Sequence, residues 1–508
     1  MAWMRVLAGV VSAALVLGIA EFVAVFTGAA GAPAYALGAS VVDHTPDGIR
    51  EWAIQAFGTN DKTVLFVCMG VVAVVVAGLA GAVERTTRPI GSIAFGVFGV
   101  FAAVVGAGRI GGFSGALPAL IGTAAGILAL RGLTRRIETD QADAGQDESG
   151  RASAGRRRVL GGIAATGVFA IGAGLAGRLL GGARTDVSAE RATVDLPAPA
   201  TPLPGLPPDA DLRVPGLTPY LTSNSEFYRI DTALIVPQVS TDSWSLRIHG
   251  MVDREITLTW DDLARRTPVE RLVTLACVSN PINGDLIGNA RWLGYRLDEL
   301  LAEAGPLPDA DMVLSTSKDG WTAGTPLSAL TDGRDALLAI GMNGEPLPLQ
   351  HGYPARLVVP GLYGYVSATK WVTELEVTRF DQAFAYWTRR GWSAHGPIKT
   401  GTRIDIPRGR GRIPQGRTTI AGVAWAQHRG VTGVEVQIDN GDWLPARLST
   451  EVSIDTWRQW VYDWDATPGQ HTLRARTTDT TGIPQTALQQ DVIPDGATGY
   501  PTLTIQVA

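Results

Sequence analysis

The chain has 508 residues, 18% of them charged, and a formal net charge of −5 at pH 7. Such a length accommodates two or three domains, and the charged fraction is low for a wholly soluble protein. No nucleic acid partner is expected, because the charge is slightly negative and the globular part has no Lys/Arg-rich tract with interleaved aromatic residues.

The first 184 residues predict a transmembrane anchor. Five apolar segments, at residues 6–30, 64–83, 90–108, 113–130 and 159–180, predict membrane-spanning helices. Each is long enough, or nearly so, to cross about 30 Å of hydrocarbon. Their Gly and Ala content suits close helix packing in a bilayer, and a soluble helical bundle is the alternative. Residues 47–57 predict a short amphipathic helix in the first external loop.

Arginines set the expected orientation of this anchor. They flank the loop between the fourth and fifth segments and the loop after the second, at Arg131, Arg135, Arg136, Arg156, Arg157 and Arg158, and at Arg85 and Arg88. Both loops are therefore expected in the cytoplasm, which puts everything after residue 180 outside. We predict a multi-pass protein of the cell membrane with an extracytoplasmic globular half. Residues 156–158 also fit an internal twin-arginine export signal, and both interpretations stay open.

The globular half begins after a proline-rich linker at residues 185–219, which predicts an extended tether. Residues 220–394 predict an α+β domain. Strands are expected at residues 245–248, 256–259, 272–275, 312–316 and 357–359, and short helices at 260–266 and 297–304. Residues 395–508 predict an Ig-like β-sandwich, with strands at 418–424, 431–438, 443–446, 457–464, 471–477 and 502–507.

Cys277 is the residue that points most directly to chemistry. The chain has two cysteines, which rules out a disulfide scaffold, a zinc finger and a protein-ligated iron–sulfur cluster. The other one, Cys68, lies in an apolar segment. Cys277 is therefore either an inert buried thiol or a single soft ligand for a metal whose other ligands are not protein.

Several blocks around Cys277 resemble the molybdopterin-dependent sulfite oxidase family over the whole globular half. They occur in the family's order at residues 224–229, 274–280, 288–292, 342–348, 351–361, 363–365 and 370–371. The pattern at residues 422–425 and 434–436 is similar to the family's dimerisation domain. One such block is a weak signal, but all of them in order are specific.

The resemblance implies a molybdenum–molybdopterin cofactor, with Cys277 as the one protein ligand of the metal. A thiolate is a soft ligand that is fully deprotonated when metal-bound. Arg356 and Lys370 match positions that hold the phosphate of the pterin, since Arg offers a planar fork and Lys a point charge. The pterin-contacting positions are matched by Asn224, Tyr228, His351 and Ser367.

The implied reaction is two-electron oxygen-atom transfer, most directly on sulfite or a related sulfur–oxygen compound. Arg229 matches an arginine of the family's sulfite pocket, and Arg291 could substitute for a second one. Ile340 stands where animal and plant sulfite oxidases have a tyrosine, and their further arginine falls near Val366. This weaker cationic pocket leaves two alternatives open, namely a methionine sulfoxide or nitrate reductase and a non-catalytic envelope interaction module.

Partners follow from the same resemblance. The chain has no CxxCH haem-attachment motif and no histidine within a predicted span, so no haem is expected. Electrons would then pass to or from a separate carrier, a quinone or a cytochrome. A homodimer through residues 395–508 is also implied.

Overall fold

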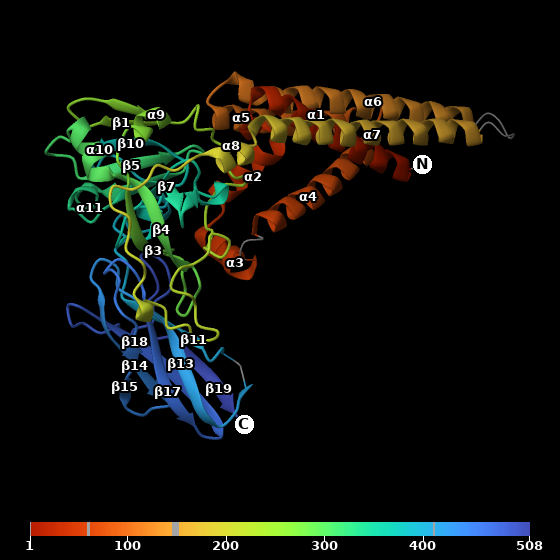
Figure 1. Cartoon of the computed structure of the whole chain (residues 1–508). Coiled ribbons are helices and arrows are strands. Elements are labelled where there is room, and N and C mark those ends of the chain that lie inside the picture. Colours follow the sequence, from red (N-terminus) through yellow and green to blue (C-terminus); the bar gives the residue numbers. More distant parts are fainter. Residues whose placement is uncertain (1, 58–60, 145–151, 410–411) are drawn as a thin grey trace. The chain divides into compact units, whose positions relative to one another are not determined.

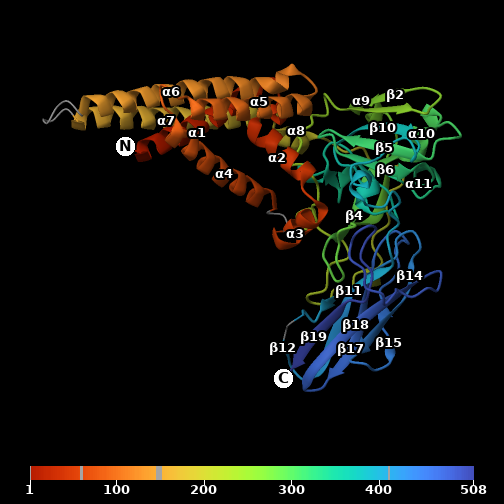
Figure 2. The same ribbon diagram turned by 180° about the vertical axis from the view of Figure 1, so that it is seen from behind.

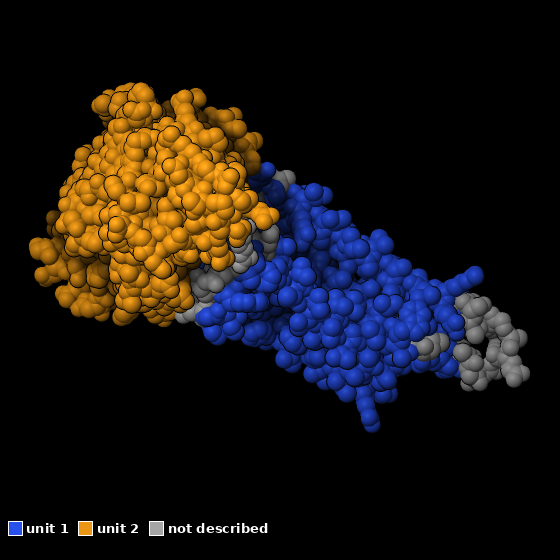
Figure 3. Space-filling view, turned by 90° about the horizontal axis from the view of Figure 1, so that it is seen from below, with its two compact units in different colours: residues 1–186, 232–235 blue, residues 187–231, 236–508 orange. Residues whose placement is uncertain are grey.

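The computed structural model describes residues 2–57, 61–144, 152–409 and 412–508 (Figure 1). They form two compact units, coloured separately in Figure 3. The first comprises Met1–Asp186 with Thr232–Ile235, and the second comprises Val187–Asp231 with Val236–Ala508. The first unit is helical, whereas sheets dominate the second.

Among the described residues of the first unit, five helices are long and apolar enough to cross a membrane. They are α1 (Ala2–Thr27), α4 (Asp61–Val83), α5 (Ile90–Ile110), α6 (Leu117–Ala144) and α7 (Ala152–Thr185). Each predicted span falls on one of them. Helix α1 packs against α4, α6 and α7. Small residues allow this packing: a Cβ on Gly9 of α1 would lie 2.0 Å from the Ala77 carbonyl oxygen of α4.

The first predicted span differs from the structure at its carboxyl end. Helix α1 stops at Thr27, and a separate helix α2 (Pro33–His44) follows that the sequence did not predict. Pro33 lies in the first turn of α2, where its missing N–H costs no hydrogen bond. The predicted amphipathic helix is confirmed as α3 (Asp47–Phe57).

The proline-rich segment is not a free tether, which corrects the prediction for residues 185–219. Residues from Val187 onward belong to the second unit, where they include the short helix α8 (Ser188–Thr193). Arg191 Nε donates to the Leu347 carbonyl oxygen at 2.7 Å. Farther along, Leu217 packs against Ala421 and Val461. The segment therefore lies along the second unit as a strap.

Two sheets form the α+β part of the second unit, as predicted. The first has the order β2-β1-β10-β5-β6, and the second joins β3-β4-β7-β8, with β9 paired to β7. The strands are β1 (Ser245–Gly250), β2 (Ile256–Thr259), β3 (Val269–Ala276), β4 (Ile287–Arg296), β5 (Met312–Ser317), β6 (Thr322–Pro326), β7 (Leu337–Met342), β8 (Glu345–Pro346), β9 (Arg356–Val358) and β10 (Val372–Thr378). The helices are α9 (Trp260–Ala264), α10 (Leu297–Ala304) and α11 (Leu327–Thr331).

The second of these sheets is covered on both faces. Every residue of β7 is buried, as are the last five of β3. Coverage on both faces explains why the sequence of β7 is a continuous apolar run rather than an alternating one. Side chains of β3, β4, β7 and β9 share one core with Phe227. The candidate site lies at the end of this buried sheet.

The carboxyl-terminal part holds two further sheets, of order β11-β13-β17-β16 and β12-β19-β18-β14-β15. Figures 1 and 2 show their long strands. The strands are β11 (Gly401–Ile406), β12 (Arg412–Ile413), β13 (Gly416–Trp425), β14 (Val431–Ile438), β15 (Trp443–Pro445), β16 (Arg447–Leu448), β17 (Arg458–Ala466), β18 (Gly469–Asp479) and β19 (Thr502–Val507). Inward side chains of both sheets, such as Trp460 and Val436, share one core. A β-rich region is thus confirmed, while the Ig-like topology stays a prediction.

Candidate active site

Cys277 lies immediately after β3, where the buried strand gives way to a loop rich in polar and turn-forming residues. Its backbone N–H donates to the Leu286 carbonyl oxygen at 2.9 Å, and its own carbonyl oxygen accepts from the Asn280 N–H at 3.1 Å. These bonds close the loop on itself. The side chain is half-buried, and within the described part of the chain it forms no disulfide. The thiol is thus fixed at the end of a rigid strand yet still accessible.

A second segment, the η6 turn (Gly364–Val366), faces the end of β3. A Cβ on Gly364 would lie 3.8 Å from the Ala276 carbonyl oxygen and 3.9 Å from Tyr228 Oη. Burial raises the pKa of Tyr228, and the Cys277 charge raises it further. Burial also raises the pKa of Tyr363 to about 12, with Asp495 and Cys277 adding to the rise. Two phenol groups therefore lie within electrostatic reach of the thiol.

Arg356 is a buried cation without an acidic partner among the described residues. Its guanidinium donates to carbonyl oxygens of Leu357, His351 and Ala368, at 3.3, 3.1 and 3.4 Å. It also lies over the Trp292 ring, 5.0 Å from the centroid. Burial lowers the pKa of Arg356 to about 10. Because an uncompensated buried charge is costly, this guanidinium suits an anion that is not part of the protein.

Lys370 and Arg229 share one carboxylate. Lys370 Nζ lies 2.5 Å and Arg229 Nε 2.9 Å from Asp231 Oδ2, and this aspartate side chain is only 6% exposed. Burial lowers the pKa of Lys370 to about 8, although the Asp231 charge opposes the shift. With Arg356, these groups place three cations and one anion around a shared region, leaving a net positive charge.

His351 is a neutral imidazole at neutral pH. Burial, reinforced by the Arg356 charge, lowers the pKa of His351 to about 4. Its Nε2 lies 3.0 Å from the Asn224 carbonyl oxygen, which can only accept, so Nε2 carries the proton. Nδ1 is then the acceptor of the ring. Phe227 packs edge-on against both His351 and Trp292, which fixes the imidazole plane.

Two predicted site residues, Asn224 and Ser367, have contacts within the protein instead. The Asn224 side chain bonds to Asn343, Glu345 and the Met342 carbonyl oxygen. Ser367 Oγ donates to the Tyr363 carbonyl oxygen at 2.9 Å. Asn224 still contacts the site through its carbonyl oxygen, which lies 3.0 Å from His351 Nε2. Ser367 is close to Lys370 in the sequence.

Arg291 is not brought to this group. Its neighbour Trp292 points toward Arg356, and successive side chains of a strand point to opposite faces. Arg291 instead lies 3.5 Å from Glu270. The structure therefore disfavours its predicted role as a second substrate arginine.

Asp231 and Tyr363 belong to the arrangement although sequence reasoning did not select them as site residues. Both lie inside or next to the resembling blocks, Asp231 two residues after Arg229. An Arg-x-Asp spacing is a common local ion pair, so it gave no reason to expect that Lys370, 139 residues away, would share the carboxylate.

Comparisons with known proteins identify the family of this chain. Residues 233–387 match the family profile "Oxidoreductase molybdopterin binding domain". Human mitochondrial sulfite oxidase is 30% identical over 301 residues, covering 50% of this chain and 55% of that one. An uncharacterized oxidoreductase of Bacillus subtilis is 31% identical over 153 residues, which cover 30% of this chain and 74% of that one.

The chain belongs to the sulfite oxidase family of molybdopterin oxidoreductases. It carries the molybdopterin-binding oxidoreductase domain of that family. The chain spans about half the length of the mitochondrial sulfite oxidases that it matches. Among solved structures, the sulfane dehydrogenase SoxCD from Paracoccus pantotrophus shares the fold, with a TM-score of 0.51 and 24% identity over 57% of this chain and 82% of that one.

The residues present fit the molybdopterin cofactor that this family implies. Among the described residues, no group of three or more His, Cys, Asp or Glu side chains could hold a metal by itself, so a metal bound at Cys277 would need ligands from a cofactor. The guanidinium of Arg356, which has no carboxylate partner among the described residues, suits the cofactor's phosphate. As a molybdopterin family member the chain would hold it with Cys277, Arg356 and Lys370.

Proposed function

We propose that this protein is a membrane-anchored, extracytoplasmic molybdenum–molybdopterin oxidoreductase that transfers an oxygen atom to or from a small sulfur–oxygen compound, with sulfite as the first candidate. The observation that carries the proposal is Arg356, buried with carbonyl and ring partners but no carboxylate among the described residues. The arginine pattern and the five apolar helices support residues 1–184 as the anchor.

Each residue has a defined role in this proposal. When bound, the cofactor supplies two-electron oxygen-atom transfer at its metal. The Cys277 thiolate would be the protein's ligand to that metal. Arg356 and Lys370 would hold the phosphate. His351, neutral and with Nδ1 as acceptor, would receive a hydrogen bond from a ring N–H of the pterin. Arg229 would attract an anionic substrate, and an external quinone or cytochrome would exchange the electrons.

A specific observation favours a neutral sulfoxide as a second substrate class. Asp231 partly neutralises Arg229, and Arg291 lies outside this group, paired with Glu270. Ile340 and Val366 are buried apolar side chains, each 1% exposed. With Arg356 and Lys370 assigned to the phosphate, Arg229 is left as a partly neutralised cation for the substrate, and it attracts the sulfite dianion weakly. Methionine sulfoxide, which is neutral at its S=O group, does not depend on that charge.

The test uses the full chain purified in detergent from cells that make the cofactor. The expected result is about one molybdenum per chain, with activity either for sulfite and an artificial oxidant or for methionine sulfoxide and a reduced dye. Cys277→Ser should abolish turnover while the fold remains, because a hard hydroxyl does not replace the thiolate. Molybdenum-free wild-type protein, or an active Cys277→Ser variant, would contradict the proposal.

We further propose that residues 220–394 form the catalytic domain and residues 395–508 an Ig-like domain of the dimerisation type. The shared core of the two carboxyl-terminal sheets supports this division. Light scattering of the purified protein, compared with a variant carrying charges on the exposed strands, tests whether a dimer forms through this domain.

A further inference from the structure

The strand that leads to Cys277 is held by residues from the far end of the chain. Thr274, three positions before the cysteine, is fully buried. Its N–H donates to the Asp455 carbonyl oxygen at 3.0 Å, and its Oγ1 accepts from the Trp457 N–H at 2.9 Å. Its carbonyl oxygen accepts from Gln427 Nε2 at 3.4 Å. All three partners belong to the carboxyl-terminal β region.

The loop after Cys277 is held from the same region. Arg403 Nη1 donates to the Gly284 carbonyl oxygen at 3.1 Å, and the Ile404 N–H donates to Asn283 Oδ1 at 2.8 Å. Arg403 and Ile404 lie on β11. Cys277 is therefore bracketed on both sides by hydrogen bonds from one region, made by three separate segments of it.

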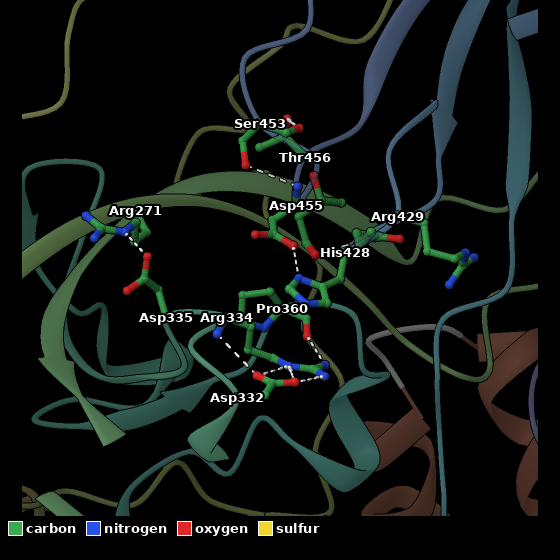
Figure 4. A network of polar contacts seen from close by, with 12 residues as sticks. Arg271, Asp332, Arg334, Asp335, Pro360, His428, Arg429, Ser453, Asp455 and Thr456 are labelled. Carbon is green, nitrogen blue, oxygen red and sulfur yellow. Dashed lines mark hydrogen bonds and ion pairs between the residues drawn. The ribbon is translucent and has the colours of Figure 1, made fainter. Parts of the chain in front are cut away.

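The segments that bind β3 are also hydrogen-bonded to one another. His428 Nδ1 lies 3.1 Å from Asp455 Oδ1, and the His428 N–H donates to the Ile454 carbonyl oxygen at 3.0 Å. Figure 4 shows His428 directed at Asp455, and Arg334 reaching the Pro360 carbonyl oxygen, a bond of 3.0 Å. Pro360 precedes the loop of Tyr363 and Gly364. One group of bonds therefore holds the segments that bind β3, and a separate bond holds the residue before the loop that faces the thiol.

We propose that the carboxyl-terminal β region acts as a clamp that fixes the position of the Cys277 sulfur, with Thr274 and Asn283 as positioning residues. The clamp consists of Arg403, Ile404, Gln427, Asp455 and Trp457. The inference rests on the proposed function in taking Cys277 as the metal ligand. Its physical basis is that a metal ligand must be held within a fraction of an ångström. Strand β3 ends one residue before Cys277, so the pairing of that strand does not by itself fix the cysteine. This region then completes the active site, beyond any role in dimerisation.

The test measures how fast iodoacetamide alkylates Cys277 in cofactor-free full chain carrying Cys68→Ala, which leaves one cysteine to react. Thr274→Val removes the hydroxyl that Trp457 and Asn289 bond. We expect alkylation to become about thirtyfold faster, the combined effect of two lost buried hydrogen bonds on a local opening equilibrium. Thr274→Ser, which keeps the hydroxyl, should restore the slow rate. Molybdenum content after cofactor supply should fall in Thr274→Val and recover in Thr274→Ser.

Ser449→Ala is the matched control, because it removes a buried hydroxyl of the same region whose one hydrogen bond among the described residues comes from the Gln459 N–H, at 3.1 Å. It should leave the alkylation rate unchanged. If Thr274→Val does not fold, Asn283→Gly tests the other flank, since glycine keeps the backbone angle φ of +62°. An unchanged alkylation rate in the folded variants, or an equal rise in Ser449→Ala, would overturn the clamp. Molybdenum-free wild type would instead overturn the proposed function.

Discussion

Lys370 Nζ lies 2.5 Å from Asp231 Oδ2, and the same carboxylate binds Arg229. The buried Asp231 carboxylate therefore partly neutralises both Lys370, proposed to bind the phosphate, and Arg229, proposed to bind the substrate. The balance between them sets how strongly the site attracts a dianion, and it can be changed by a single substitution.

Asp231→Asn should lower the KM for sulfite several-fold while leaving the KM for methionine sulfoxide unchanged. The amide releases the full charge of Arg229 and Lys370, which attracts only the anionic substrate. The free energy of unfolding should fall by about 3 kcal/mol, because two cations lose their buried partner. Steady-state kinetics at low and high salt check the prediction, since salt should reduce the effect. Equal changes for both substrates would contradict it.

Arg356→Ala should lower the molybdenum content at least tenfold, because the proposed phosphate anchor is removed. Arg356→Lys should recover part of it, since an ammonium keeps the charge but not the planar fork. Metal analysis of purified protein gives the measurement. The control is Arg296→Ala, an arginine of the same unit that is paired with Asp298. Full occupancy in Arg356→Ala would place the phosphate elsewhere.

His351 should make the cofactor-free protein sensitive to acid between pH 6.5 and about 4. The pKa of His351 is about 4 in the folded chain and 6.5 in the unfolded chain. Between these two pH values the unfolded chain therefore binds one more proton than the folded chain. The free energy of unfolding should therefore decrease as the pH falls from 6.5 to about 4, by up to about 3 kcal/mol.

His351→Gln keeps the Nε2 donor to Asn224 and should remove this part of the pH dependence. Urea unfolding at several pH values provides the comparison. An identical slope in the variant and the wild type would show that another group titrates in this range.

Gly9→Leu should destabilise the helical unit by about 2 kcal/mol, the usual cost of overpacking. A Cβ there would lie 2.0 Å from the Ala77 carbonyl oxygen and 2.8 Å from the Gly81 Cα, and backbone cannot give way as a side chain can. Gly70→Leu on α4 is the control, because its Cβ would meet nothing within 4 Å. Thermal melting of both variants in detergent tests the α1–α4 contact, and equal melting temperatures would argue against it.

Patterns local in sequence predicted most of the fold. Five long apolar segments coincide with helices able to cross a membrane, since length and composition alone decide that property. The carboxyl-terminal strands followed from alternating residues and turn signals. Helix α2 and strands such as β4 and β7 were missed, because burial on both faces or a short Gly/Ala-rich segment leaves no clear period.

The residue types of the site, a soft thiol with an arginine and a lysine in a family-specific order, were fixed by the chain alone. Tertiary structure decided how their charges are balanced. It gave Lys370 and Arg229 a shared aspartate, left Arg356 without an acid among the described residues, and turned Arg291 toward Glu270. It also brought Thr274 against Asp455 and Trp457, more than 180 positions away. Ion pairs and hydrogen bonds depend on which residues are close in space, and the spacing of residues along the chain does not determine this.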